Sequence, residues 1–276
     1  MGDHKKQKSQ KIVIFIFLIV LTVVFLAPYF WMLTNSFKST KEIMLEPERF
    51  FPEQFTLESY KKVLTEAPYF DWLKNSIIIT GTDTIAILIT SSLIGFVFSR
   101  YSFKGRKTLF QIILATMMVP GSCLIIPNFI LLSSFGWYDK LYALILPCFF
   151  SAFGVYLCKQ FIDEIPRDIF ESAEIDGATD WTIYFRIVVS MIRPAIGSLA
   201  IFTSIGFWND YETPLIFLNS TKKMTLPLAL AFFNSKHMTD LSATMAAAAL
   251  IMLPEMVLFL LLQKQFVKGI AMTGMK

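Results

Sequence analysis

The sequence predicts an all-α membrane protein with six transmembrane helices and a polar, structured segment on one face of the bilayer. Of its 276 residues, 55% are hydrophobic and 28 are phenylalanine. A soluble domain covers much of its exterior with polar residues, so this composition favours a lipid-facing exterior. Long uncharged runs support this, because a helix needs about 20 apolar residues to cross the hydrocarbon core. Residues 12–37 and 108–138 are two such runs.

The hydropathy pattern predicts six spans, at about residues 12–36, 75–99, 108–133, 141–160, 194–219 and 241–263. Acidic residues interrupt three of them. Asp83 is expected close to the outer end of the second span, where it is solvated or capped. Glu255 follows Pro254 deep in the sixth span, where it is expected to be protonated or hydrogen-bonded to a freed carbonyl.

The first span differs from a cleaved signal peptide, because its apolar run is too long and no small-x-small site follows it. Orientation depends on the short loop 100–107, which carries four positive charges and is therefore expected in the cytoplasm. Both termini and residues 163–193 then lie on the cytoplasmic side. The outer segment 36–71 is expected to fold back as a loop with one short helix over residues 57–65, which Thr56 would cap.

The segment 163–193 is too long and too charged to be only a turn. Pro166 suits the first turn of a helix, and Gly177 is placed to end that helix with a positive φ. A second helix is expected over residues 181–192 with Asp180 as its N-cap, and Pro194 would begin the fifth span.

The first of these helices is expected to have two different faces. Ile169 shares one face with residues that are small or short, namely Ser172, Ala173 and Asp176. Glu171 and Glu174 project elsewhere and can offer carboxylates to basic groups of a partner. The alternative is an amphipathic helix lying on lipid, but anionic lipid favours a basic polar face and would repel this acidic segment. A docking surface is therefore favoured.

Other classes of function are poorly supported. The net charge of +4 is small and forms no basic patch, so no nucleic-acid partner is expected. The chain has only two histidines, His4 and His237, which argues against a metal centre or a membrane-embedded enzyme. Three cysteines within or at the ends of apolar runs do not predict a disulfide framework. The sequence also lacks a G-x-x-x-x-G-K-[ST] phosphate-binding loop, so the chain is not expected to hydrolyse ATP.

At residues 171–178 the chain closely resembles the permease subunits of ABC importers, whose EAA loop has the pattern E-A-A-x-x-x-G-A. Glu171, Ala173, Gly177 and Ala178 match, and Ser172 replaces one alanine with another small residue. The match continues at Asp176, Phe185, Ile187 and Pro194. Ser190 stands where relatives usually have proline, which affects the local backbone shape but not the assignment.

The resemblance covers nearly the whole chain and points to the carbohydrate-importer branch. It includes the segments 208–210 (Trp-Asn-Asp), 224–227 (Met-Thr-Leu-Pro) and 265–269 (Gln-Phe-Val-Lys-Gly). The size is similar to that of the smaller partner of the maltose-type permease pair. The implied architecture is the type I ABC importer permease fold, with six transmembrane helices and a cytoplasmic coupling helix.

The resemblance also implies partners. They are a second homologous permease subunit, two ATPase subunits, and an extracellular or periplasmic sugar-binding protein. ATP and Mg²⁺ would bind the ATPase, so no cofactor is expected in this chain. Glu171, Ser172, Ala173, Asp176, Gly177 and Ala178 would belong to the coupling helix, and Glu171 would pair with a basic residue of the ATPase. Closure of the ATPase dimer would then switch the cavity between its inward- and outward-facing states.

A second candidate site lies in the fifth span, where polar and aromatic residues are densest. Its members are Trp208, Asn209, Asp210, Tyr211 and Glu212. At 1.5 Å per residue Asp210 lies about 24 Å from Pro194, in the outer part of the bilayer. A sugar pathway needs aromatic faces and hydrogen-bonding groups, but Trp208 and Tyr211 could equally be interfacial anchors, with Asp210 in helix packing.

Two other transport functions remain open. The solute could be something other than a sugar. An ion-coupled secondary transporter is less well supported, because such proteins usually show repeated halves and paired carboxylates at the midplane.

Overall fold

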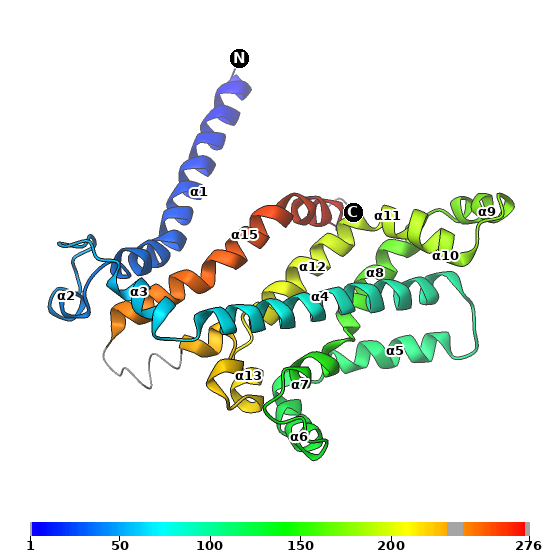
Figure 1. The fold of residues 1–276 in the computed structure, drawn as a ribbon. Coiled ribbons are helices and arrows are strands. Elements are labelled where there is room, and N and C mark those ends of the chain that lie inside the picture. Colours follow the sequence, from blue (N-terminus) through cyan, green and yellow to red (C-terminus); the bar gives the residue numbers. More distant parts are fainter. Residues whose placement is uncertain (1, 231–239, 274–276) are drawn as a thin grey trace. The chain divides into compact units, whose positions relative to one another are not determined.

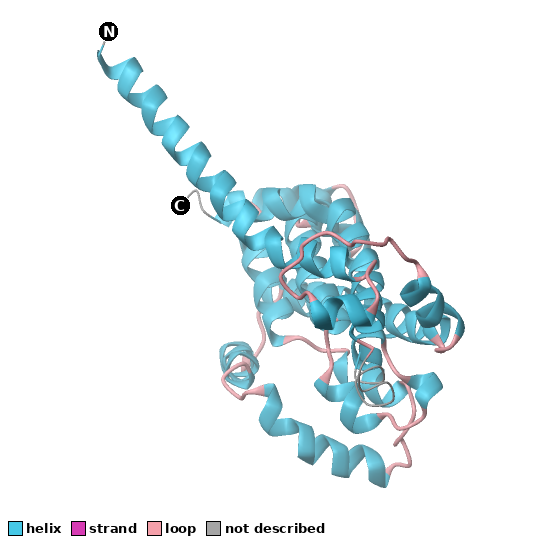
Figure 2. Ribbon diagram, turned by 90° about the vertical axis from the view of Figure 1, so that its left-hand side faces the viewer, coloured by secondary structure: helices cyan, strands magenta, loops and turns pink. Residues whose placement is uncertain are grey.

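A computed structural model describes residues 2–230 and 240–273 of the chain (Figure 1). Every regular element in these ranges is a helix, and Figure 2 shows loops as the only other structure there. The predicted all-α class is confirmed. His237 lies outside the described residues. The described residues divide into two compact units, which consist of residues 2–69 with 230 and 240–253, and of residues 70–229 with 254–273.

The first unit contains two long helices and two short ones. They are α1 (Gly2–Asn35), α2 (Thr40–Leu45), α3 (Glu58–Thr65) and the first part of α15 (Leu241–Thr273). The most apolar stretch of α1, within Gln10–Asn35, is 0% buried, as suits a helix surrounded by lipid. The short helix expected in the outer segment corresponds to α3, but Leu57 occupies its N-cap position. Thr56 instead accepts a hydrogen bond of 3.2 Å from the Glu58 amide.

Asp240 holds the polar centre of the first unit together. Its carboxylate accepts hydrogen bonds from Thr40 Oγ1 at 2.7 Å, from Lys62 Nζ at 3.0 Å and from the Ala243 amide at 3.1 Å. Burial opposes ionisation of this carboxyl, but these hydrogen bonds outweigh it and lower the pKa of Asp240 to about 2. The Asp240 carboxylate thus connects α15 to Thr40 and Lys62, which lie far from it in the sequence.

The second unit is built from helices of very different length. They are α4 (Tyr69–Arg100), α5 (Arg106–Thr116), α6 (Gly121–Ser134), α7 (Tyr142–Ile145), η1 (Leu146–Cys148), α8 (Ala152–Asp163), α9 (Arg167–Ile175), α10 (Asp180–Thr182), the π-helix η2 (Ile183–Val188), α11 (Val189–Met191), α12 (Arg193–Trp208), α13 (Glu212–Phe217), η3 (Thr221–Lys223) and α15 from Pro254. The long helix α4 runs through this unit (Figure 1).

The third predicted span, about residues 108–133, corresponds to two helices. Residues 106–134 form α5 and α6, which meet at an angle of 94°. The break falls before Gly121, where Pro120 is extended, with φ −61° and ψ 131°. A proline disfavours helical geometry in the residue before it and lacks the N–H that would continue the ladder. The uncharged run therefore changes direction sharply without losing its apolar character.

The fifth predicted span is also shorter than expected. Its helix, α12, ends at Trp208, and a turn separates it from α13. The segment before it, Asp180–Met191, meets α12 at 75°. Four helical segments among the described residues are long and apolar enough to cross a membrane, and up to six spans result if each bent pair counts as one.

Helices α4 and α8 pack closely against each other at two glycines. A Cβ on Gly95 would lie 3.0 Å from Cys158 Cβ, and one on Gly154 would collide with Ser91 Oγ. Glycine therefore lets the two backbones approach, as small residues do between membrane helices. The apolar core around this contact includes Phe96, Ile162 and Phe170, the last of which belongs to α9.

In the loop before α7, a second carboxylate fixes the chain. Asp139 accepts hydrogen bonds from the Asn219 and Ser220 amides at 3.0 and 2.9 Å, and from Lys223 Nζ at 2.8 Å. Burial raises the pKa of this carboxyl, but the hydrogen bonds from Lys223 and Ser220 dominate and hold it well below its usual range. The turn before α7 is thus attached to the segment after α13.

Candidate functional site

The helix predicted to dock on a partner is α9. It starts after Pro166, which occupies the N-cap position, and ends in a Schellman motif. The Gly177 amide donates to the Glu174 carbonyl at 2.9 Å, and the Ala178 amide donates to the Ala173 carbonyl at 2.9 Å. Gly177 has φ +77°, the positive value that its position in the sequence predicted. Glycine therefore sets the point at which the chain leaves this helix.

The faces of α9 differ from those expected. Phe170 is buried in the core, and Ile169 and Ala173 pack against it. Ser172 and Asp176 are exposed, whereas Ile169 and Ala173 are half-buried, so the four residues do not share one face. The predicted shared face is therefore divided, because the large apolar Phe170 determines which side of α9 packs on the core.

Small residues at the end of α9 serve packing within this chain. Ala173 and Ala178 are half-buried and contact the core cluster, so they do not provide an open surface for another backbone. Asp180 is not the N-cap of the second helix either. That role belongs to Thr179, whose Oγ1 accepts a hydrogen bond of 3.3 Å from the Thr182 amide.

The two glutamates of α9 have different surroundings. Glu174 forms an ion pair with Arg100, the last residue of α4, and this guanidinium lies 5.3 Å from the centre of the Phe170 ring. Glu171 is exposed and lines a cavity of about 560 Å³ between α9 and the 99–106 segment. Glu174 therefore has a partner inside the chain, whereas Glu171 lies beside open space.

The outward surface of this region has an apolar character that the sequence did not reveal. Ile175 is 87% exposed, Trp181 64% and Phe185 63%. The rings of Trp181 and Phe185 stack with centroids 6.0 Å apart. We call Glu171, Ile175, Trp181 and Phe185 the coupling surface. The exposure of Ile175 could have been predicted from its position, because helical periodicity places it outside the stripe formed by Ile169, Phe170 and Ala173.

Four of the five polar and aromatic residues expected in the fifth span line one cavity. Asn209, Asp210, Tyr211 and Glu212 border a space of about 600 Å³. Further polar groups around it come from α6 and α13, namely Ser122, Asn128 and Thr213. We call this space the polar cavity. Asp210 also accepts a hydrogen bond of 3.1 Å from the Thr213 amide, which fixes the turn between α12 and α13.

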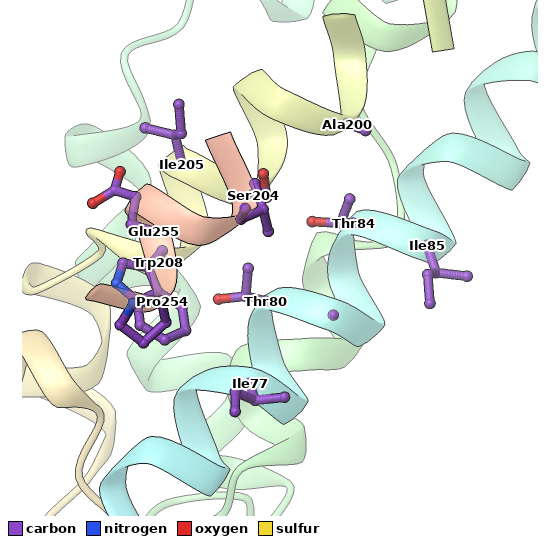
Figure 3. A pocket seen from close by; sticks show the side chains of 12 residues that line it. Ile77, Thr80, Thr84, Ile85, Ala200, Ser204, Ile205, Trp208, Pro254 and Glu255 are labelled. Carbon is purple, nitrogen blue, oxygen red and sulfur yellow. The ribbon is translucent and has the colours of Figure 1, made fainter. Parts of the chain in front are cut away.

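Trp208 faces a different space. It is 6% exposed and lines a second cavity of about 330 Å³ between α4, α12 and α15. Pro254 lines the same cavity, and in Figure 3 the Thr80 side chain points from α4 toward Trp208 and Pro254, while the Thr84 side chain points toward Ser204. Because α12 ends at Trp208, this residue and the next one, Asn209, line different cavities. The predicted cluster of five is therefore divided, and a buried Trp208 does not fit an interfacial anchor.

Glu255 has a specific partner. The Asn209 side-chain amide donates a hydrogen bond of 2.8 Å to Glu255 Oε1. This pair could not be predicted from the sequence, because the two residues lie far apart along the chain. Asn209 thus joins the end of α12 to α15 next to Pro254, which lies inside the continuous helix.

Asp83 is not at the outer end of its span. Its helix begins at Tyr69, which places Asp83 about 21 Å along α4. The residue is 0% exposed, and neither carboxylate oxygen has a hydrogen-bond partner among the described residues. The expected solvation or capping of Asp83 is therefore wrong.

Comparisons with known proteins agree with this architecture. The family model for the binding-protein-dependent transport system inner membrane component matches residues 87–272. The arabinooligosaccharides transport system permease protein AraQ of Bacillus subtilis (strain 168) is 31% identical over 283 residues, with 100% of both chains covered. The lactose transport system permease protein LacG of Rhizobium radiobacter is 29% identical over 242 residues and 88% of each chain.

A solved structure is similar over almost the same length. It is the crystal structure of a bacterial ABC transporter involved in the import of the acidic polysaccharide alginate. The TM-score is 0.81 at 20% identity, and the match covers 95% of this chain and 98% of the other. At this identity the likeness establishes the fold, that of a type I ABC importer permease. The family match over most of the chain and the 31% identity to AraQ show that the chain belongs to the binding-protein-dependent transport system inner membrane components, and that it is a multi-pass membrane protein.

Proposed function

We propose that the chain forms half of the translocation pathway of an ATP-driven importer for a sugar or oligosaccharide. An external binding protein would deliver the solute, and a second, homologous permease would complete the pathway. The relatives support this proposal, because AraQ is named as a permease for arabinooligosaccharides and LacG as a permease for lactose. A further structural neighbour, with a TM-score of 0.65, is an alginate transporter in complex with a pentasaccharide-bound periplasmic protein.

The coupling surface is the observation that carries this proposal. Exposed apolar side chains that gather in one region and are rimmed by polar residues mark a protein interaction site, and Ile175, Trp181 and Phe185 are three such side chains. Ile175, at 87% exposure, lies between the acidic residues of this segment, so its occupant should combine an apolar pocket with basic groups. We propose that this occupant is the ATPase subunit, which would bind ATP and Mg²⁺ while this chain binds neither. Both chain termini would then lie on the cytoplasmic side.

The route from α9 into the membrane helices is short. Arg100 connects α9 to α4 through Glu174, and Phe170 is buried in the core that includes α8 and α12 residues. A displacement of α9 would therefore move packed helices as a body, as in other rigid-body switches. This supports a role of α9 in transmitting movement from the ATPase to the pathway.

The polar cavity is the proposed place of contact with the solute. It offers the ring of Tyr211 together with amide, hydroxyl and carboxylate groups, a combination that suits sugar hydroxyls and C–H faces. None of the described residues that line it is lysine or arginine, while Asp210 and Glu212 supply two carboxylates. We therefore propose that this half of the pathway favours uncharged sugars over uronates, because a uronate would meet like charge there.

Uptake into proteoliposomes that contain the assembled importer tests this function. Labelled neutral oligosaccharides should enter only with ATP and the binding protein, and faster than uronate oligosaccharides of equal length. The double variant Asp210→Asn with Glu212→Gln should reduce that preference. Uptake of a non-sugar solute alone, or uptake driven by an ion gradient without ATP, would contradict the proposal.

A further inference from the structure

We propose that the cavity beside Glu171 is a phosphate-binding site that holds the headgroup of an anionic phospholipid. The cavity has a volume of about 560 Å³ and lies where α4 ends and where α5 and α9 begin. Three arginines line it, namely Arg100, Arg106 and Arg167, together with Ser99 and Ser102. Arginine recognises phosphate oxygens in a bidentate manner, and hydroxyl groups can donate to the remaining oxygens.

The charges around this arginine cavity favour an anion. Two acidic residues, Asp163 and Glu171, also line it, but Asp163 is paired with Lys159. Glu174 outside the lining pairs with Arg100. Arg106 and Arg167 form no ion pair with any residue that the structure describes, so both guanidinium groups are available.

Arg100 and the two helix N-termini at this cavity also offer hydrogen-bond donors or positive charge without a partner among the residues that the structure describes. Nε of Arg100 is buried and has no hydrogen-bond acceptor among the described residues. Arg106 and Arg167 are the first residues of α5 and α9, and neither helix has a side-chain cap at its N-terminus. The N-terminal ends of both helices, where the helix dipole is positive, therefore lie beside the same cavity, and this charge stabilises an anion.

The position of the cavity favours a lipid as the source of the phosphate. Arg100 ends a helix long and apolar enough to cross the membrane, and Arg106 begins the next apolar segment. The cavity therefore lies at the level where a span meets water, whichever side faces the cytoplasm. Helix α5 has no buried residue, and Leu109 and Ile112 on it are 48% and 56% exposed. An acyl chain can lie along these side chains while the headgroup reaches the arginines.

Native mass spectrometry of the purified full-length chain tests the proposal. The chain is extracted in mild detergent, exchanged into mixed micelles with phosphatidylglycerol or phosphatidylcholine, and measured for retained lipid. We expect phosphatidylglycerol to be retained in preference to phosphatidylcholine. Arg106→Gln and Arg167→Gln should each weaken retention by about tenfold, since each removes one charge-assisted contact. Glu171→Gln should strengthen it, because it removes the unpaired carboxylate from the lining.

Lys107→Gln is the matched control. It removes one positive charge next to Arg106 from a residue that does not line the cavity. A second arm adds inorganic phosphate to the delipidated chain and measures its melting temperature. A rise that Arg106→Gln abolishes, without preferential retention of phosphatidylglycerol, would overturn the lipid assignment in favour of a soluble phosphate. Equal loss of lipid in Lys107→Gln and Arg106→Gln, or no effect of any arginine variant in either arm, would overturn the whole site.

Discussion

Arg100 at the end of α4 and Glu174 on α9 form an ion pair that joins a membrane-spanning helix to the helix carrying the coupling surface. The central carbon of the same guanidinium lies over the Phe170 ring, 5.3 Å from the ring centroid. The side chains are 24% and 48% exposed, so the pair is too solvated to add much stability. The pair matters for the position of α9, because it links this helix to the end of α4.

The first prediction concerns this pair. Arg100→Gln and Glu174→Gln should each lower the amount of solute transported per ATP hydrolysed, while the free energy of unfolding changes by only about 0.5–1 kcal/mol. The two effects on coupling should be non-additive, because either change breaks the same contact. Parallel uptake and ATPase assays on the double-mutant cycle check this. Fully additive effects would mean that the pair transmits nothing.

The second prediction concerns Gly177. Gly177→Pro should disrupt the end of α9, since proline can neither adopt φ +77° nor donate to the Glu174 carbonyl. Gly177→Ala has free space around its Cβ and should cost about 1 kcal/mol of left-handed strain. ATPase retention during purification is the measurement, and it should fall strongly for proline and slightly for alanine.

Gly136 provides the control for this strain. It also has a positive φ, +73°, and open space where a Cβ would lie, but it belongs to the turn before α7. Gly136→Ala should cost similar stability and leave ATPase retention unchanged. If it released the ATPase as Gly177→Pro does, general instability would explain both results.

The third prediction concerns Ile175. Ile175→Asp should weaken ATPase binding by about a hundredfold, because a charge replaces an apolar anchor in a desolvated contact. The fold should be unaffected, since Ile175 is 87% exposed. Leu45→Asp, on α2 and 69% exposed, is the matched control. Co-purification of the ATPase with each variant decides, and equal retention by both variants would remove Ile175 from the contact.

The fourth prediction concerns Tyr211 in the polar cavity. Tyr211→Ala should raise the KM for uptake by about tenfold through loss of an aromatic contact, whereas Tyr211→Phe should keep most of the affinity. ATP hydrolysis without solute should not change, because the residue lies outside the coupling surface. An unchanged KM for the alanine variant would exclude Tyr211 from the pathway.

The fifth prediction follows from Asp240. Its pKa is lowered from 3.8 to about 2, so the stabilisation is fully present above about pH 4 and is lost as the pH falls toward 2. Asp240→Asn should therefore destabilise the chain by up to about 2 kcal/mol at pH 7, and the difference should vanish near pH 2. Thermal unfolding across this range measures it. Glu48→Gln, which changes an exposed acid without an ion pair among the described residues, is the control for the loss of one carboxylate.

Much of the architecture could be predicted because local chemistry determines it. Apolar runs define the membrane helices, and a glycine after an acidic helix predicts the positive φ of Gly177. The direction of the chain is a different matter. Pro120 gave no sign in the hydropathy profile that α5 and α6 would meet at 94°, because both sides of the bend are apolar.

The sites show the same division. Trp208 and Asn209 are neighbours in the sequence, yet they line different cavities because α12 ends between them. The bond between Asn209 and Glu255 and the burial of Asp83 depend on helix packing, which one sequence does not specify. Ile175 was missed because its exposure is a property of the folded α9, not of its residue type.

A mild-detergent pull-down of the tagged chain from its native membrane, with mass spectrometry of the bound proteins, tests the proposed function most directly. Wild type and Ile175→Asp are compared under conditions that keep a known importer intact. We predict that wild type recovers a second permease and an ATPase subunit, and that the variant keeps the permease but loses the ATPase. Recovery of the wild-type chain alone would contradict the importer assignment and favour a secondary transporter.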